Sequence, residues 1–430
     1  MKHREPEIEL SRKGFVTNYP HFRYWKKEAA AGLLTEPPLN IYIHIPFCPQ
    51  KCAYCYYKTE RYKNPQQLAE FVDALCREIR LAGHRFNLGR RPVQSIYIGG
   101  GTPSLLRGKT LQTIADCLRE NTNLEAPEFT IEAEPGTITP DKVAAYKDLG
   151  VNRMSIGIQS FNDEIVRLSG RKHTADKAQK AIGIVRDAGD IAVNIDLLSG
   201  LAGETDETWS ATLDTAIASG VHNITIYKME VYLNTEFFQQ SVRRQVIRLP
   251  SEARELEFME TALEKFAASP YKPWSFFTFT LNGESRHRYA ANLWHGQDCC
   301  AFGPSGFGKL GAYNYQNANE LEHYLEAVAR DELPITRGYR LTGKDMMLRD
   351  ILLGMKLVSL ERCHFYETHG FDFCRLIPDT VDRLLADGFI VLTAEAIRLT
   401  PKGVLYGDYV GKRLADALKQ YLGPDELNLF

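Results

Sequence analysis

The sequence lacks three features that would place it in a membrane, in the secretory pathway or on a nucleic acid. No apolar run approaches the roughly 20 residues that span a bilayer. Residues 1–19 are charged and lack the apolar stretch of a secretory signal. The 52 basic and 54 acidic residues leave a formal net charge of −2, which gives no support to nucleic-acid binding. We therefore expect a cytoplasmic protein with no transmembrane segment and no nucleic-acid partner.

Disulfides are also not expected, because the cytoplasm keeps thiols reduced. The chain nevertheless has nine cysteines. Six of them are scattered along the sequence or merely adjacent to one another. The remaining three, Cys48, Cys52 and Cys55, lie within eight residues and need a separate explanation.

Residues 39–249 alternate between apolar, strand-like runs and stretches with helical periodicity, as in the βα units of a parallel sheet. Six units favour an open α/β fold, a partial (β/α)6 TIM-like barrel, over a closed eight-fold barrel. Functional residues of such folds gather at the carboxyl ends of the strands. The expected strands are 40–45, 94–98, 128–133, 152–158, 191–198 and 223–231.

The rest of the chain follows other patterns. Residues 1–38 are polar and aromatic and form an N-terminal lead-in. Residues 250–340 are an accessory segment on the substrate side, with a helix at 251–268 and then irregular, aromatic and glycine-rich sequence. Residues 341–430 follow the order helix, helix, short hairpin, helix, which predicts a small winged-helix-like domain. The near-neutral charge favours a capping or docking role for this domain over DNA binding.

The three clustered cysteines form the pattern C-x3-C-x2-C directly after the first expected strand. Three thiolates from one loop can hold three corners of an iron–sulfur cube. The fourth iron then lacks a thiolate and stays open to a small molecule, as at catalytic metal sites. The alternative is a zinc site completed by His44 or a distant histidine, because residue 57, where a fourth ligand would be sought, is Tyr57.

This cysteine pattern after a first barrel strand is the hallmark of radical S-adenosylmethionine (SAM) enzymes. The chain resembles the group of them named for oxygen-independent coproporphyrinogen III oxidase. The resemblance runs from about residue 39 to 240, and more weakly to the C-terminus. The matching motifs are YIHIPFC (42–48), SIYIGGGTPS (95–104), SIGIQSF (155–161) and NIDLLSGL (194–201).

The resemblance implies a [4Fe–4S] cluster on the three cysteines, with SAM bound to the open iron. Reduction of the cluster by a donor such as flavodoxin or ferredoxin would split SAM into methionine and a 5′-deoxyadenosyl radical. The cofactors carry that chemistry, and the protein supplies binding, orientation and exclusion of water and oxygen.

The resemblance also implies which side chains contact SAM, without identifying a catalytic residue. The glycine run would bring its backbone close to the methionine end of SAM, since glycine has no side chain. A guanidinium suits bidentate pairing with the SAM carboxylate, although a solvated arginine at a helix entry is the plainer interpretation of Arg171. Tyr42 matches a family tyrosine near the cluster but could equally be a core residue. The implied contacts are Tyr42, Gly99, Gly100, Gly101, Thr102, Glu132, Gln159, Arg171 and Asp196.

Three features bear on which member of the group the chain resembles: two departures from family motifs and one further likeness. The oxidase has a further cysteine where this chain has Tyr57. The related haem chaperones have a histidine where this chain has Tyr289, although His287 and His295 lie close. The segment 298–303 resembles the anaerobic haem-opening methyltransferases of the group.

These features favour C-methylation-type radical chemistry on a flat substrate, either a tetrapyrrole such as haem or an aromatic natural product. The group includes class C methyltransferases that bind two SAM molecules, so a second SAM and haem are further candidate ligands. A haem chaperone comes second, and a true coproporphyrinogen III oxidase third.

Two sets of aromatic residues stay open at this point. Tyr54, Tyr56 and Tyr57 could shield the cluster from solvent or simply cover the mouth of the barrel. The aromatic residues near position 275 could line a flat pocket, although such stretches are more often packing. These residues are Trp274, Phe276, Phe277 and Phe279.

Overall fold

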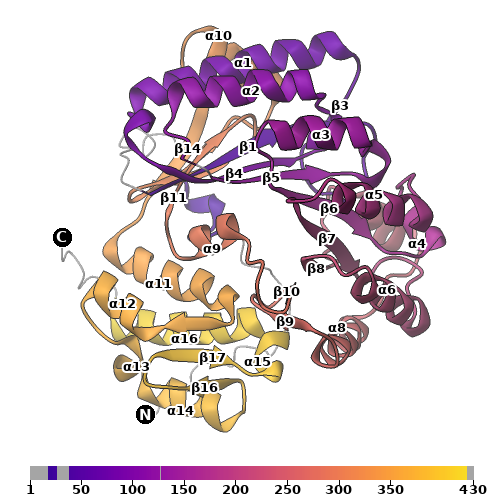
Figure 1. The fold of residues 1–430 in the computed structure, drawn as a ribbon. Helices are drawn as coiled ribbons and strands as arrows, with labels where there is room; N and C mark the ends of the chain where they lie inside the picture. The colour runs from indigo at the N-terminus through magenta and orange to yellow at the C-terminus, as the bar shows by residue number, and fades with distance from the viewer. Residues whose placement is uncertain (1–17, 27–37, 126, 424–430) are drawn as a thin grey trace.

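A computed structural model describes residues 18–26, 38–125 and 127–423, and its centre is one large twisted sheet (Figure 1). In these ranges the sheet has twelve strands, in the order β14-β13-β12-β11-β1-β4-β5-β6-β7-β8-β10-β9. The architecture is α/β with a mostly parallel central sheet. No helix in the described part of the chain is both long and apolar enough to cross a membrane.

The six strands predicted from the sequence form the middle of the sheet, and all of them run parallel. Their side chains are buried almost without interruption, as expected where both faces of a sheet are covered. The sixth is shorter than predicted, ending at Lys228 instead of residue 231. The strands are β1 Leu39–Ile45, β4 Val93–Gly100, β5 Glu128–Ala133, β6 Arg153–Gln159, β7 Ala192–Ser199 and β8 Asn223–Lys228.

Helices that connect these strands cover the outer face of the sheet (Figure 1). The helix α1 (Pro65–Arg85) shows why: Asn64 caps its first turn, proline occupies its first position, and Leu68, Phe71 and Leu75 repeat at helical spacing on its buried face. The others are α2 Gly108–Asn121, α3 Pro140–Asp148, α4 Asp163–Leu168, α5 Ala175–Asp187, α6 Asp206–Ala218 and α8 Glu252–Ala267.

The accessory segment is more regular than predicted, and the irregular assignment was wrong. Its strands extend both edges of the barrel sheet: β10 and β9 pair beyond β8, and β11 to β14 pair beyond β1. These strands are only 3–6 residues long, so pairing with an existing edge specifies them more than local periodicity does. They are β9 Tyr271–Pro273, β10 Thr278–Leu281, β11 Asp298–Phe302, β12 Phe307–Leu310, β13 Tyr313–Asn317 and β14 Ile335–Arg340, with helices α9 Arg288–Trp294 and α10 Leu321–Ala329.

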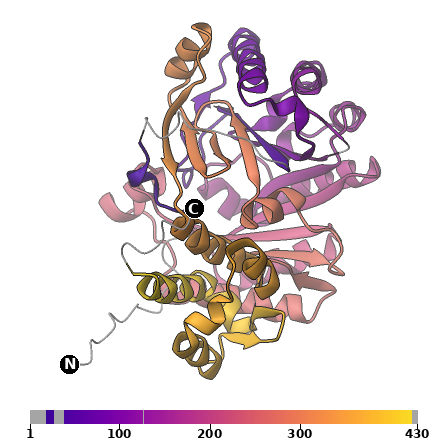
Figure 2. The same cartoon turned by 90° about the vertical axis from the view of Figure 1, so that its left-hand side faces the viewer.

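The C-terminal part forms a compact unit with its own apolar cluster, below the sheet in Figures 1 and 2. A three-stranded sheet in the order β15-β17-β16 packs with several helices, which fits the predicted helix–hairpin–helix order. The elements are α11 Gly343–Gly354, β15 Ser359–Glu361, α12 Arg362–His369, α13 Phe373–Leu376, α14 Pro378–Ala386, β16 Ile390–Leu392, β17 Ala396–Leu399, α15 Pro401–Leu405 and α16 Gly407–Tyr421.

Candidate functional site

A cavity of about 440 Å³ lies at the carboxyl ends of the parallel strands, and we call it the cluster cavity. Its volume lies within the usual range for small-molecule sites, about 300–1,000 Å³. It brings together most of the residues that the sequence singled out. These are Cys48, Cys52, Cys55, Gly100, Gly101, Thr102, Glu132, Gln159, Arg171 and Asp196.

The cysteine loop follows β1 and is held on several sides by its own backbone. The Cys55 amide donates to the Cys52 carbonyl at 3.1 Å, and the Ala53 amide donates to the Ser169 carbonyl at 3.0 Å. Two short strands, β2 (Phe47–Cys48) and β3 (Glu60–Arg61), pair across its base. The three thiols therefore line the cavity from a loop that backbone hydrogen bonds hold against its neighbours.

The donor set fits a cluster better than a single metal ion. All nine cysteines are free thiols. In the described residues, no three cysteine, histidine or acidic side chains converge closely enough to hold one ion, whereas zinc needs four ligands around one point. Burial raises the pKa of the Cys48 thiol and raises that of Cys55 to about 11, so bound iron would be needed to keep both as thiolates.

The glycine run at the end of β4 lets the cysteine loop approach the sheet. The Gly101 amide donates to the Ile45 carbonyl at 2.7 Å, and a Cβ at this position would lie 2.5 Å from the Phe47 carbonyl oxygen. Thr102 continues the contact, since its hydroxyl lies 3.4 Å from the Cys48 sulfur. Gly99 is turned toward Tyr97 and Glu132 and does not line the cavity. Close backbone packing is thus one reason for glycine here, whatever else the turn binds.

Glu132 projects from β5 into the cavity. Its carboxylate accepts hydrogen bonds from the Tyr97 hydroxyl at 2.6 Å and from the Gly100 amide at 3.0 Å. Burial raises its pKa to about 7, so near neutral pH the group is poised between charged and neutral forms. A ligand that donates to this carboxylate would favour the charged form.

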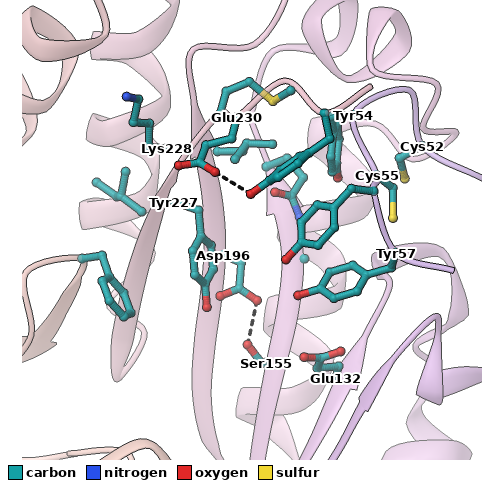
Figure 3. Close-up of a pocket in the computed structure, with 18 of the residues that line it drawn as sticks. Cys52, Tyr54, Cys55, Tyr57, Glu132, Ser155, Asp196, Tyr227, Lys228 and Glu230 are labelled. Atoms are coloured by element: carbon teal, nitrogen blue, oxygen red, sulfur yellow. Dashed lines mark hydrogen bonds between the residues drawn. The ribbon is translucent and has the colours of Figure 1, made fainter. Parts of the chain in front are cut away.

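Asp196 projects from β7 and accepts hydrogen bonds from the Ser155 hydroxyl at 2.8 Å and the Asn194 amide at 2.9 Å. Burial raises its pKa to about 6. Figure 3 shows Asp196 in the middle of the cavity, with Tyr227 and Tyr57 entering from opposite sides. These polar partners orient the carboxylate toward any ligand in the cavity.

Arg171 is nearly buried, with a side chain only 10% exposed, so it is not a solvated residue at a helix entry. Its Nη2 donates to the Gly157 carbonyl at 2.7 Å, and its Nη1 donates to the Tyr54 hydroxyl at 3.1 Å. The same Nη1 lies 3.8 Å from the Cys52 sulfur. Gln159, at the end of β6 with φ of 70°, also lines the cavity. The guanidinium therefore lies beside the cysteine loop, where an anionic ligand group would meet it.

Tyr42 is placed apart from the other predicted contacts. Its hydroxyl lies 2.9 Å from Nδ1 of His44, and both side chains line a neighbouring, larger cavity. Tyr56 and Tyr57 line both cavities. Their rings stack at 4.4 Å between centroids, and the Tyr232 ring lies 4.4 Å from that of Tyr56. These three tyrosines form a wall that the two cavities share.

Several lining residues escaped the sequence analysis. Tyr227, Lys228 and Glu230 lie at or just after the end of β8, where the strand-end rule would have found them (Figure 3). The C-terminal unit also lines the cavity, through residues 404–409. No local sequence pattern predicts this contact. Phe276 and Phe277 line the cavity as well, which resolves the open question about them in favour of a pocket.

The residues considered for haem ligation do not converge. The Tyr289 hydroxyl lies 3.8 Å from the Cys299 sulfur, and burial raises its pKa well above the usual value, so the phenol stays protonated. His287 lies 3.5 Å from the Glu128 carboxylate. The His295 ring lies against His364, with centroids 5.7 Å apart. Iron ligation by this segment would therefore need rearrangement.

Comparison with known proteins gives consistent similarities. The family model described as the radical SAM superfamily matches residues 42–216. The haem chaperone HemW of Bacillus subtilis is 27% identical over 375 residues, covering 86% of this chain and 97% of the relative. Anaerobilin synthase of Escherichia coli O157:H7 is 32% identical over 303 residues, covering 69% of this chain and 66% of the relative. The structure of coproporphyrinogen III oxidase (HemN) from Escherichia coli has a TM-score of 0.81 at 24% identity and covers 93% of this chain and 96% of that one.

Proposed function

Because the chain belongs to the radical SAM superfamily, in the group that includes oxygen-independent coproporphyrinogen III oxidases and haem chaperones, we propose that it binds and reductively cleaves SAM in the cluster cavity. The observation that carries the proposal is the convergence of three free thiols, one nearly buried arginine and two partly buried carboxylates in one cavity. A [4Fe–4S] cluster on Cys48, Cys52 and Cys55 would supply the electron that breaks the C5′–S bond of SAM.

The protein's own side chains would bind and orient SAM. Arg171 supplies a fixed cation beside the cysteine loop for the carboxylate of SAM, and Glu132 supplies an acceptor for its amino group. Asp196, held by Ser155 and Asn194, supplies acceptors for ribose hydroxyls. The aromatic residues and the C-terminal unit line the same space and would limit the access of water to bound SAM.

The relatives change the order of the predicted functions. HemW matches almost over its full length, and it is named a haem chaperone. We therefore propose haem binding and transfer as the first function. C-methylation-type chemistry on haem becomes the second candidate, favoured by the likeness to anaerobilin synthase. The oxidase is third, because Tyr57 occupies the position of its further cysteine and lines the cavity.

One anaerobic experiment separates these functions. The reconstituted protein is incubated with SAM, a reductant and haem, and the products are identified by mass spectrometry. Stoichiometric haem binding without a new tetrapyrrole supports the chaperone. A methylated or ring-opened tetrapyrrole supports the second candidate. Formation of neither a haem complex nor 5′-deoxyadenosine would contradict the proposed function.

A further inference from the structure

The second cavity, of about 1,220 Å³, is lined by parts of the chain that lie far apart in sequence, and we call it the side cavity. Its walls come from β1, from α9 and the strands β11 to β13, from α11 and α16, and from residues 18–24. Figure 1 shows α9 between the large sheet and the C-terminal unit, with α11 on the side of that unit that faces α9. The volume exceeds what SAM needs and suits a larger flat ligand.

Arg349, on α11, is a buried cation of this cavity whose charge is only partly compensated inside the protein. It is only 5% exposed, and its Nε and Nη1 atoms have no hydrogen-bond partner. Its Nη2 makes a long hydrogen bond of 3.3 Å to the Leu293 carbonyl. The nearest carboxylate, Asp350, lies 3.8 Å away and is itself engaged by His369 at 2.8 Å. A buried guanidinium in this state is costly unless a ligand supplies the missing acceptor.

Lys309, which lines the same cavity, differs from Arg349 in having a close carboxylate partner. Its ammonium group pairs with the Asp298 carboxylate at 3.2 Å and donates to the Gly296 carbonyl at 2.8 Å. Its charge is therefore already balanced inside the protein. Arg349, with two guanidinium nitrogens unpartnered, is better placed than Lys309 to receive an outside anion.

Two more buried polar atoms in the same lining are unpartnered. His44 is 4% exposed, and its Nε2 has no hydrogen-bond partner, although its Nδ1 contacts Tyr42. Asn314 is 1% exposed and leaves its Oδ1 unpartnered, while its Nδ2 donates to the Tyr19 carbonyl. Buried polar groups are nearly always hydrogen-bonded, so three such groups around one cavity indicate a polar ligand.

The lining also carries several aromatic rings, which can stack on a flat conjugated molecule. Phe22 and Phe307 stack at 4.6 Å between centroids, and Trp294 and Tyr289 line the same space. The wall of Tyr56, Tyr57 and Tyr232 separates this space from the cluster cavity.

We propose that the side cavity binds the tetrapyrrole through a propionate-type carboxylate on Arg349, with the ring system among these aromatic side chains. The proposal rests on the proposed function, because it places the flat ligand on the far side of the tyrosine wall from SAM. It predicts that recognition depends on the ligand's carboxylates and requires no iron.

The probe is protoporphyrin IX, which has carboxylates but no metal, and its dimethyl ester, which lacks the charges. Binding to the reconstituted protein is followed anaerobically by porphyrin fluorescence. Arg349→Gln should weaken protoporphyrin IX binding about ten-fold or more, as expected for a lost charge-assisted contact. The ester should bind the unchanged protein about as weakly as protoporphyrin IX binds the Arg349→Gln protein. The substitution should not change the affinity for the ester. The control is Arg375→Gln, an exposed arginine on α13.

The ester comparison keeps the test decisive even if the Arg349→Gln protein fails to fold. Leu352→Trp, which narrows the side cavity, should also weaken porphyrin binding without changing SAM binding. Equal binding of acid and ester, or no porphyrin binding at all, overturns the inference. SAM binding and cleavage are measured on the same samples, so failure of the proposed function is seen separately.

Discussion

The two cavities differ in how their polar groups are satisfied. In the cluster cavity, Glu132, Asp196 and Arg171 already have internal partners that fix their orientation. In the side cavity, Arg349 and His44 keep buried atoms without partners. A preorganised site holds its side chains ready for one cofactor. A site with unmet hydrogen bonds is completed by its ligand. This difference agrees with the proposal that the cofactor binds in the first cavity and the tetrapyrrole in the second.

Removal of one thiol from the cluster cavity should have the largest effect of the changes that test this difference between the cavities. Cys48→Ala, Cys52→Ala or Cys55→Ala should each abolish the visible chromophore of the reconstituted cluster and its bound iron, because each thiolate holds one iron. Cys363→Ala, at an exposed cysteine, should leave both unchanged. Porphyrin binding in the side cavity should survive all four changes. A full cluster in any of the three loop variants would break the assignment.

Arg171→Ala should give the next largest effect. Loss of a charged hydrogen-bond donor costs about 1.5–3 kcal/mol, so SAM should bind roughly ten- to a hundred-fold more weakly. Iron content should stay the same. Titration calorimetry under nitrogen measures the affinity, and Arg167→Ala, at an exposed arginine paired with Glu164, is the control. Unchanged affinity would remove Arg171 from the SAM site.

Glu132 and Asp196, whose pKa values are raised by partial burial, predict that the stability of the metal-free protein depends on pH. Folding raises the pKa of Glu132 from 4.5 to about 7. The folded state therefore holds this proton more tightly, and the stabilising contribution is complete below pH 4.5 and lost as the pH rises through 7. Asp196 acts in the same direction, from 3.8 to about 6.

Glu132→Gln should accordingly flatten the fall in stability between pH 5 and 8, measured by urea unfolding. Glu125→Gln, at an exposed glutamate, should leave the slope as it was. If the stability of the Glu132→Gln protein and of the unchanged protein depended on pH in the same way, folding would not raise the pKa of Glu132.

The smallest expected effect concerns the C-terminal unit where it closes the cluster cavity. A Cβ at Gly407 would lie 2.7 Å from the Phe276 ring, whereas at Gly411 the nearest atom would be 3.7 Å away. Gly407→Ala should lower the unfolding free energy by about 1–3 kcal/mol through overpacking. Gly411→Ala should be neutral or stabilising, since alanine favours helix more than glycine does. Equal melting temperatures for the two variants would mean that Gly407 and the Phe276 ring are not closely packed.

The two cavities also differ in how far the sequence predicts them. Cys48, Glu132 and Asp196 follow or lie in strands with clear periodicity, so the strand-end rule places them together. Arg349 and Asn314 become neighbours only through the pairing of short strands and the docking of the C-terminal unit. Such contacts depend on tertiary packing, and no local pattern encodes them. Tyr42 was recognised by its motif and shares the sheet face of Tyr97, which contacts Glu132, but its side chain lines the other cavity.

The most direct test of the account is whether SAM binds to a cluster held by only three thiolates. The oxygen-protected, reconstituted protein is reduced, and its electron paramagnetic resonance spectrum is recorded before and after SAM is added. The account predicts that SAM shifts the cluster signal and that 5′-deoxyadenosine and methionine form in equal amounts. A protein that carries zinc in place of the cluster, or a cluster signal that SAM leaves unchanged with no cleavage, would contradict it.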